Sequence, residues 1–570
     1  MKRLILTLSL LLTASTLFAQ SSDDDFFQKA QKEFAQFSQQ SKSTYNDFRQ
    51  KANASYAEFL KSAWKKAGMQ QPTEPPKIDP PVQPVAPQPK PQPKPQPKPQ
   101  PKVEPQQPAK PAQPAQPTQP AQPQKPVQPE KPAKPTQPEQ PQPQPQPQPE
   151  PTPEPTPEPL REAEDTINPK PLVFKSVIPM DKPKVTPFPR YEIPEVTPED
   201  EPFMLPMPID YFGETCTIRL KPGTGEVKLP TATNELISDA WKKLSDGRFD
   251  PMFADCMAAR KKLGLNDWGY FQLTKKVAEE FCETKNSNNS KILQAFLMTQ
   301  AGYKIRMGRF NGKLFLLFPC EEEINGKPFI KWENDPTRYY LLDEDSAMAL
   351  KISVCEMCDA AFPGEIGFSL DMPTLPELPY APSVSRVHKS VRYPNLVVDI
   401  NANKNLINFF NTYPQGPWKM FAYSSLSPRT KELIYPALKK AIEGKSEIAA
   451  ANILINFVQT GFSYKVDREQ FGVERSLFGD ESLFYPYCDC EDRAILYSIL
   501  MRDLLGVKVA LVHYPGHLAT AVCFSEGKVY GDYLEVNGDK YTVCDPTYIN
   551  ATVGMTMTTM NNAEAEVILL

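Results

Sequence analysis

Three residues near the C-terminus, Cys490, His517 and Asp545, have the types and the order required for nucleophilic chemistry. A nucleophilic cysteine needs a base within hydrogen-bond reach, and that base needs an acceptor that fixes its orientation. A single histidine at the start of a strand is usually structural, and an aspartate before a proline usually belongs to a turn. Taken together, the three residues supply the nucleophile, the base and the orienting acceptor, and they predict a Cys–His–Asp triad.

A helix is expected to carry the thiol. Apolar residues recur at helical spacing through residues 491–505, Gly506 provides a stop, and Asp489 is a suitable N-cap. Cys490 would then lie in the first turn, where free backbone N–H groups and the helix dipole favour a thiolate. Cys488 would lie just outside the helix and lack this advantage.

Strands are expected to carry the other two groups. Alternating apolar residues predict strands over residues 507–514, 518–524 and 541–544, so that His517 begins one strand and Asp545 follows another. His517, Ala519, Ala521 and Cys523 would share one face, and the two alanines would let the helix that starts with Cys490 approach it closely. Cys544 would point to the opposite face from Cys523, so no disulfide between them is expected.

Three short motifs carry a resemblance to a known family. Residues 489–494 read DCEDRA and resemble the "DCEDxA" core of bacterial transglutaminase-like proteins. Residues 516–522 read GHLATAV, similar to their "GHxxxAV" strand, and residues 544–548 read CDPTY, similar to their "xDPTY" segment. The match covers roughly residues 385–570.

The resemblance implies an α+β, papain-like or transglutaminase-like domain over residues 381–570, with a helix packed on an antiparallel sheet. It also implies that Cys490 attacks an amide or ester carbonyl, that His517 takes and returns the proton, and that Asp545 orients the imidazole. No cofactor or metal is expected. The backbone N–H of Cys490 is the first expected oxyanion donor, and the hydroxyl of Tyr485 or Tyr487 is a candidate second donor.

Residues 201–380 are expected to form a degenerate copy of the same domain. Helical stretches are predicted over residues 234–244, 272–282 and 290–300, followed by strands at 303–307, 313–318 and 339–342. Lys313 would stand where His517 stands, Asp343 would echo Asp545, and the position matching Cys490 would fall at about Ser287. Chance similarity of two helix–strand–strand units is the alternative.

The N-terminal third has a different character. Residues 1–20 resemble a signal peptide, with a retained membrane anchor as the alternative. Residues 21–70 carry an aromatic stripe that predicts an amphipathic helix, which would pack on its own domain, self-associate, or bind a membrane or an envelope partner. Residues 71–200 hold most of the 66 prolines and predict a disordered, extended linker.

Composition excludes some classes of protein. The net charge of −4 and the lack of a basic run interleaved with aromatics give no support to nucleic-acid binding. The ten cysteines are spread too widely for a small disulfide scaffold. Cys355 and Cys358 have metal-like spacing but no second pair, so a local disulfide or two buried thiols is expected there.

These features together predict an exported, cysteine-dependent amide hydrolase or acyltransferase, located in the periplasm, in the cell envelope or outside the cell. Its expected substrate is a peptide or protein amide, including cell-wall peptides, and hydrolysis is favoured over cross-linking. The alternative is a non-catalytic cell-envelope scaffold that uses a transglutaminase-like fold to bind a partner.

Overall fold

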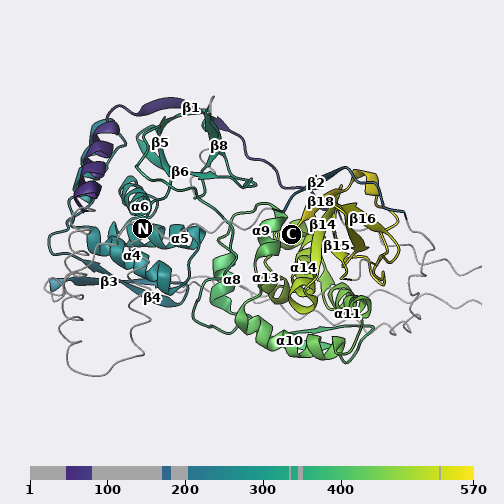
Figure 1. Ribbon diagram of the computed structural model, residues 1–570. Coiled ribbons are helices and arrows are strands. Elements are labelled where there is room, and N and C mark those ends of the chain that lie inside the picture. Colours follow the sequence, from purple (N-terminus) through teal and green to yellow (C-terminus); the bar gives the residue numbers. More distant parts are fainter. Residues whose placement is uncertain (1–45, 80–169, 181–202, 333–334, 344–350, 526–527) are drawn as a thin grey trace, which may run out of the picture. The chain divides into compact units, whose positions relative to one another are not determined.

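The computed structural model describes residues 46–79, 170–180, 203–332, 335–343, 351–525 and 528–570. The predicted signal peptide and most of the Pro-rich linker lie outside these residues. The described chain is an α+β protein of helices and mainly antiparallel sheets (Figure 1). No helix within the described ranges is both long and apolar enough to cross a membrane.

The first part of the fold is a closed barrel accompanied by helices. Its strands are hydrogen-bonded in the order β1-β7-β8-β6-β5-β9. They are β1 (Trp64–Gln70), β5 (Arg306–Phe310), β6 (Lys313–Cys320), β7 (Phe329–Trp332), β8 (Asp335–Tyr340) and β9 (Val354–Cys358). The other elements are the hairpin β3 (Leu205–Tyr211) and β4 (Glu214–Leu220) and the helices α3 (Asn234–Leu244), α4 (Asp250–Lys262), α5 (Asp267–Phe281) and α6 (Asn288–Gln300).

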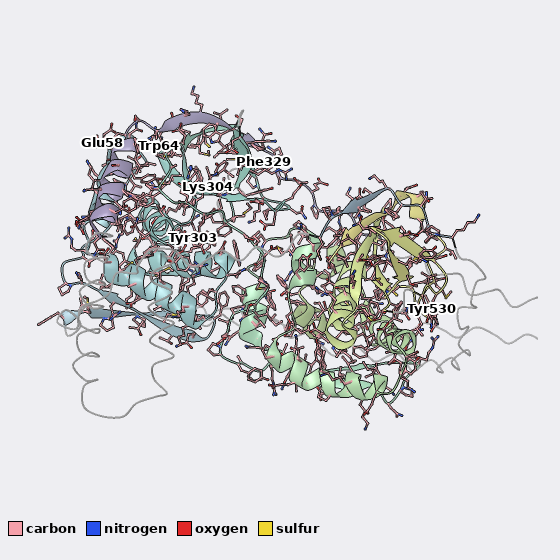
Figure 2. The ribbon with its side chains drawn as sticks, in the orientation of Figure 1. Glu58, Trp64, Tyr303, Lys304, Phe329 and Tyr530 are labelled. Carbon is pink, nitrogen blue, oxygen red and sulfur yellow. The ribbon has the colours of Figure 1, made fainter. Side chains whose placement is uncertain are left out.

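The segment before the barrel corrects the predicted N-terminal helix. Residues 46–59 are helical, but residues 64–70 form β1 and do not continue the helix. The buried Tyr56 ring lies 4.8 Å from the ring of Trp241, so the described part of the stripe packs on its own fold. Trp64, labelled in Figure 2, begins β1, and the Arg309 guanidinium lies 4.4 Å from its ring centre.

The second part of the fold is a six-stranded sheet with helices. Its strand order is β16-β17-β15-β14-β18-β2. The strands are β2 (Ser176–Ile178), β14 (Lys508–Tyr514), β15 (His517–Cys523), β16 (Tyr533–Val536), β17 (Asp539–Cys544) and β18 (Glu566–Leu569), with a 3₁₀ turn at Asn562–Glu564. The helices are α8 (Lys404–Phe410), α9 (Trp418–Tyr423), α10 (Pro428–Ile442), α11 (Glu447–Thr460), α12 (Asp467–Gln470), α13 (Gly479–Phe484) and α14 (Cys490–Leu505). Two small ladders, β10 (Arg386–Lys389) with β11 (Val397–Ile400) and β12 (Ser463–Tyr464) with β13 (Tyr487–Cys488), complete it.

Strand β2 was not expected, because it lies inside the stretch read as a linker. It pairs in parallel with β18, so that Val177 lies opposite Val567. A short apolar segment between proline-rich runs has thus been recruited to the edge of the sheet, where it satisfies the backbone groups of β18.

Helix α14 begins and ends where the sequence predicts. Asp489 is its N-cap, Cys490 is its first residue, and Gly506 ends it with a left-handed φ of 69° that an L side chain adopts only at a cost. Figure 1 shows α14 running along β14 and β15.

The face of the sheet that α14 covers differs from the prediction. Leu518 and Val522 share one apolar core with α14, whereas Ala519 and Ala521 belong to a separate core on the other face. The prediction was wrong because alternation along a strand shows which residues share a face but not which face a helix covers. Here the larger side chains bury against the helix.

The barrel and the six-stranded sheet share one strand order. The series β7-β8-β6-β5-β9-β1 matches β16-β17-β15-β14-β18-β2 strand for strand. In each sheet the central hairpin directly follows a helix, α6 before β5 and β6, and α14 before β14 and β15. The central hairpins also agree in register, because Phe310 pairs with Lys313 and Tyr514 pairs with His517 across two-residue turns. The barrel differs by closing between β1 and β7 and by an antiparallel β1–β9 pair.

Candidate active site

His517 and Asp545 are in direct contact. Nε2 of His517 lies 2.9 Å from Oδ2 of Asp545, and both side chains are buried. The other carboxylate oxygen of Asp545 accepts the backbone N–H groups of Thr547 at 2.9 Å and Tyr548 at 3.1 Å. These three bonds fix the carboxylate, and the carboxylate in turn fixes the plane of the imidazole.

The second imidazole nitrogen is left unused by this contact, and among the described residues no hydrogen bond joins it to the Cys490 thiol. Nδ1 of His517 is buried and has no hydrogen-bond partner in the described part of the chain. A buried ring nitrogen without a partner is costly unless a function requires it. An imidazole that is anchored through Nε2 presents Nδ1 as the site for a proton.

Cys490 contacts the backbone of the residue that follows this histidine. Its Sγ accepts the backbone N–H of Leu518, the residue after His517, at 3.4 Å. The thiol also lies 3.6 Å from Oε2 of Glu491. Cys488 instead sits in β13, ahead of the helix, and burial raises the pKa of its thiol to about 12. The structure therefore brings the thiol of Cys490, rather than that of Cys488, to the start of β15.

The protonation state of this thiol differs from the expectation. Burial, and then the Glu491 and Asp489 carboxyls, raise the pKa of Cys490 well above the ordinary range of a cysteine. The helix N-terminus was expected to favour the thiolate, but desolvation and neighbouring acidic groups outweigh it. In this arrangement Cys490 is a thiol at neutral pH and needs a base to become a nucleophile.

The three predicted site residues are closed off from solvent in this structure. Cys490 is 0% exposed, and His517 and Asp545 are each 1% exposed. Next to the triad, the backbone N–H of Asp79 donates to the carbonyl of Gly516 at 2.9 Å, and Ile78 is buried. Residues 78 and 79, at the start of the stretch predicted as a disordered linker, thus lie against the turn that leads into His517, which corrects the prediction for this part of the stretch.

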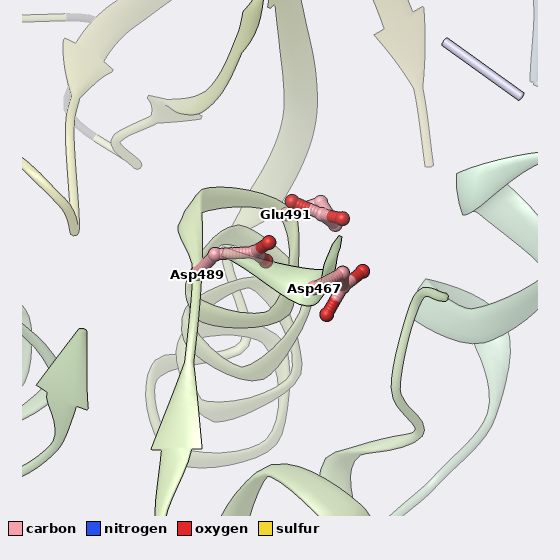
Figure 3. Close-up of side chains that lie close together, drawn as sticks. All are labelled: Asp467, Asp489 and Glu491. Atoms are coloured by element: carbon pink, nitrogen blue, oxygen red, sulfur yellow. The ribbon is translucent and has the colours of Figure 1, made fainter. Parts of the chain in front are cut away.

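A cluster of buried carboxyls lies beside the thiol. Asp467, Asp489 and Glu491 each direct an oxygen toward a common space, and these oxygens lie within 4.8 Å of one another (Figure 3). Neither oxygen of Asp489 has a hydrogen-bond partner among the described residues. Burial raises the pKa of all three, with Asp492 and Asp489 adding to the effect on Asp467.

Such a cluster must be neutralised by protons or by a cation. Carboxylate oxygens are the ligands that hard divalent cations such as Ca²⁺ take, so Asp467, Asp489 and Glu491 are the residues that could hold one. The sequence analysis expected no metal. Asp489 and Glu491 flank Cys490 and were visible as acidic neighbours, but Asp467 comes from a separate helix that no motif connects to them.

Gln459, on α11, supports the loop that carries the aspartate. Its Nε2 donates to the carbonyls of Asp545 at 3.0 Å, Tyr548 at 2.8 Å and Ala551 at 3.0 Å. One buried amide thereby links three backbone carbonyls of the loop over residues 545–551. Sequence reasoning missed this residue, because a glutamine late in a helix carries no signal of its long-range partners.

The tyrosines first considered as oxyanion donors point elsewhere. The hydroxyl of Tyr485 donates to Oδ1 of Asn411 at 2.8 Å, and the side chain of Tyr487 is exposed. Tyr464 is different: it pairs with Cys488 in the β12–β13 ladder, and its hydroxyl is buried without a hydrogen-bond partner among the described residues.

The barrel contains a matching arrangement with different side chains. Oδ1 of Asn288, the first residue of α6, accepts the backbone N–H of Leu314 at 2.8 Å, as Sγ of Cys490 accepts that of Leu518. Asn288, and not Ser287, therefore occupies the position of Cys490; Ser287 is the N-cap, as Asp489 is. Lys313 holds the register position of His517.

The residue of the barrel that corresponds to Asp545 forms an ion pair. Continuing the β6–β8 register by two residues places Leu342 opposite Leu316, as Cys544 lies opposite Thr520, so Asp343 follows as Asp545 does. Oδ2 of Asp343 lies 2.8 Å from Nζ of Lys291, and both side chains are buried. A pocket of about 320 Å³ borders Asn288, Lys291 and Lys313.

All ten cysteines lie within the described ranges and all are free thiols. Cys544 belongs to the core that α14 shares and Cys523 packs against the core on the other face, so the two side chains lie on opposite faces as strand alternation predicts. Cys355 and Cys358 are two buried thiols, one of the two possibilities that the sequence left open.

In comparisons with known proteins, no family model, no curated protein and no solved structure matches the chain significantly.

Proposed function

We propose that this protein is an exported thiol hydrolase of peptide or protein amides, with a papain-like, transglutaminase-like domain over residues 381–570. The observation that carries the proposal is the anchored imidazole. Nε2 of His517 is fixed by Asp545, and Nδ1 is buried without a hydrogen-bond partner among the described residues, one residue before Leu518, whose N–H donates to Sγ of Cys490. A purely structural histidine in such a core would be expected to use both nitrogens.

The proposed reaction follows from these contacts. Nδ1 of His517 accepts the proton of the Cys490 thiol as the sulfur attacks the carbonyl carbon. The imidazolium then protonates the leaving amine, the C–N bond breaks, and a thioester to Cys490 remains. Water attacks this thioester, gives its proton to His517, and the released thiolate regains the proton. The Asp545 carboxylate stabilises the imidazolium in both halves of the cycle.

The closed resting state sets a condition on this reaction. A substrate carbonyl cannot reach a sulfur with 0% exposure, so the segment around Ile78 and Asp79, or another covering element, must move first. Opening would also admit water, which reduces the desolvation that raises the pKa of Cys490.

We further infer that the barrel and its helix α6 are a degenerate copy of this domain. The shared strand order, the equal hairpin register and the contact of the helix start with β6 support a duplication. With Asn288 in place of the thiol and Lys313 in place of the base, this copy lacks both groups that acyl transfer requires.

The test uses purified protein and its Cys490→Ala, His517→Ala and Cys488→Ala variants. Wild type and Cys488→Ala should hydrolyse an activated ester and a mixed peptide library, while the other two variants should lose at least a hundred-fold in kcat/KM. Iodoacetamide should alkylate Cys490 faster in wild type than in His517→Ala. Equal hydrolysis by wild type and Cys490→Ala would refute the proposal.

One observation favours a second candidate, a non-catalytic envelope scaffold. The complete burial of the triad is what a binding protein that retains an unused site would show. Comparing the proteins of cells that carry Cys490 or Cys490→Ala separates the two. New cleavage products only with Cys490 support the hydrolase, and unchanged peptides together with an unchanged set of co-purifying partners support the scaffold.

A further inference from the structure

We propose that the hydroxyl of Tyr464 is the second oxyanion donor of the candidate site, acting with the backbone N–H of Cys490. This inference rests on the proposed acyl-transfer function. It assigns a catalytic role to a residue that no motif marks and replaces Tyr485 and Tyr487 as candidates.

The position of Tyr464 is set by a short parallel ladder. Strand β12 pairs with β13 so that Tyr464 lies opposite Cys488, two residues before the nucleophile. The guanidinium of Arg493, on the first turn of α14, lies 5.2 Å from the centre of the Tyr464 ring. Arg493 itself is buried and donates to the carbonyls of Gln459 at 3.2 Å and Phe462 at 2.8 Å. The tyrosine ring is therefore held against the start of the helix that carries the thiol.

The hydroxyl is in an unusual state. Its oxygen is buried, and it has no hydrogen-bond partner among the described residues, although buried tyrosine hydroxyls normally have one. Burial, and next the charge of Cys490 and then of Asp489, raise the pKa of Tyr464 well above the ordinary range. The group therefore remains a neutral hydrogen-bond donor at neutral pH.

These properties are those of a preorganised oxyanion donor. The N–H of Cys490 is the first of α14 and has no partner within the helix. When the sulfur attacks a carbonyl, negative charge develops on an oxygen next to Sγ, and a donor that is already desolvated and unoccupied stabilises it without reorganisation. The carbonyl oxygen of the substrate would thus satisfy the polar group that the resting structure leaves without a partner.

The test separates this role from a structural one. Tyr464→Phe removes only the hydroxyl, and loss of one oxyanion donor should lower kcat for an activated ester by roughly 100-fold with KM within about three-fold. Alkylation of Cys490 by iodoacetamide forms no oxyanion, so its rate should stay within two-fold of wild type. Tyr487→Phe, which removes an exposed hydroxyl nearby, is the matched control and should leave both rates unchanged.

Each outcome has a clear reading. If Tyr464→Phe lowers both kcat for the ester and the rate of Cys490 alkylation, the residue only positions Cys490 and the proposal is wrong. If wild type hydrolyses the ester and Tyr464→Phe does so equally well, the oxyanion role alone is refuted. If wild type and Cys490→Ala are equally inactive, the proposed function fails and this inference fails with it.

A second measurement does not depend on the variant folding. In a crystal structure of the wild type with a peptide aldehyde bound to Cys490, the hemithioacetal oxygen should lie within about 3.2 Å of the Tyr464 hydroxyl. An oxygen that points away from Tyr464 would overturn the proposal.

Discussion

Replacing Asp467 with asparagine should remove part of the pH dependence of stability. Asp467 is 1% exposed, and burial together with Asp492 and Asp489 raises its pKa. Above the ordinary pKa of an aspartate the unfolded chain releases this proton while the folded chain keeps it. The folded state then binds more protons, so the free energy of unfolding falls as pH rises until the raised folded pKa is passed.

The magnitude follows from one proton. A fully retained proton changes the free energy of unfolding by ~1.4 kcal/mol per pH unit, so the step from pH 6 to pH 8 costs wild type about 2.7 kcal/mol through this group. Asparagine does not titrate, and its side-chain oxygen can still accept the N–H of Arg475, which Oδ2 of Asp467 accepts at 2.7 Å. Between pH 6 and pH 8, the free energy of unfolding of Asp467→Asn should therefore fall by about 2 to 3 kcal/mol less than that of wild type.

Urea unfolding followed by tryptophan fluorescence at pH 6 and pH 8, with a chelator present, measures this difference. Asp47→Asn, on the exposed face of the N-terminal helix, is the control and should show the wild-type pH dependence. If Asp467→Asn and wild type differ by less than about 0.5 kcal/mol between the two pH values, Asp467 is ionised in the folded state and the reasoning is wrong. Repeating the pH 8 measurement with millimolar Ca²⁺ tests the cation: stabilisation of wild type that Asp467→Asn lacks shows that the cluster binds it.

Three further predictions concern the barrel and the covering segment. Lys291→Ala should lower the free energy of unfolding by about 3 kcal/mol, because it removes the buried ion-pair partner of Asp343. In urea unfolding, the double variant Lys291→Met with Asp343→Leu should recover most of this loss, because it replaces both charges with apolar side chains. Ile78→Asp should speed alkylation of Cys490 by at least ten-fold, since a charge cannot remain buried beside Gly516, whereas Lys77→Asp at the exposed neighbour should not; equal rates would show that another element covers the site. Lys313→Ala should leave ester hydrolysis within two-fold of wild type, because the barrel copy takes no part in the proposed chemistry, and a large loss of kcat would contradict that.

Local patterns predicted the elements well and their surroundings less well. Periodicity and the caps predicted α14 and its Cys490 start, and the helix predicted over residues 234–244 is α3. The strand predicted at 303–307 lies at Arg306–Phe310, because Gly302 and Tyr303 extend the end of α6 with backbone bonds to Thr299 and Met298. Boundaries of this kind depend on competition between adjacent hydrogen-bond patterns, which a single sequence does not reveal.

The three residues of the proposed triad could be named from the sequence for a reason that does not apply to the rest of the candidate site. Cys490, His517 and Asp545 stand in short motifs, whereas Gln459, Tyr464 and Asp467 reach the site from other elements. The state of the thiol also depended on those elements, since burial and carboxyls outweigh the helix end. A motif specifies which groups are present, but desolvation is a property of the whole packed core.

A comparison of the barrel with the six-stranded sheet, which share one strand order, distinguishes the contacts that hold the candidate site together from the groups that would make it reactive. In both, the first side chain of a buried helix accepts a backbone N–H at the second residue of a central strand: Asn288 from Leu314, and Cys490 from Leu518. That contact therefore does not depend on a thiol, and it serves first to dock the helix start on the sheet. In the barrel the amide oxygen of Asn288 accepts a stronger hydrogen bond than a thiol would, and Asp343 forms an ion pair with Lys291. The arrangement there is purely structural. In the second sheet a weaker sulfur acceptor takes the same place, and one nitrogen of the His517 ring has no hydrogen-bond partner within the described ranges. Stability has been given up there at two positions, and both are where the proposed reaction needs a nucleophile and a base.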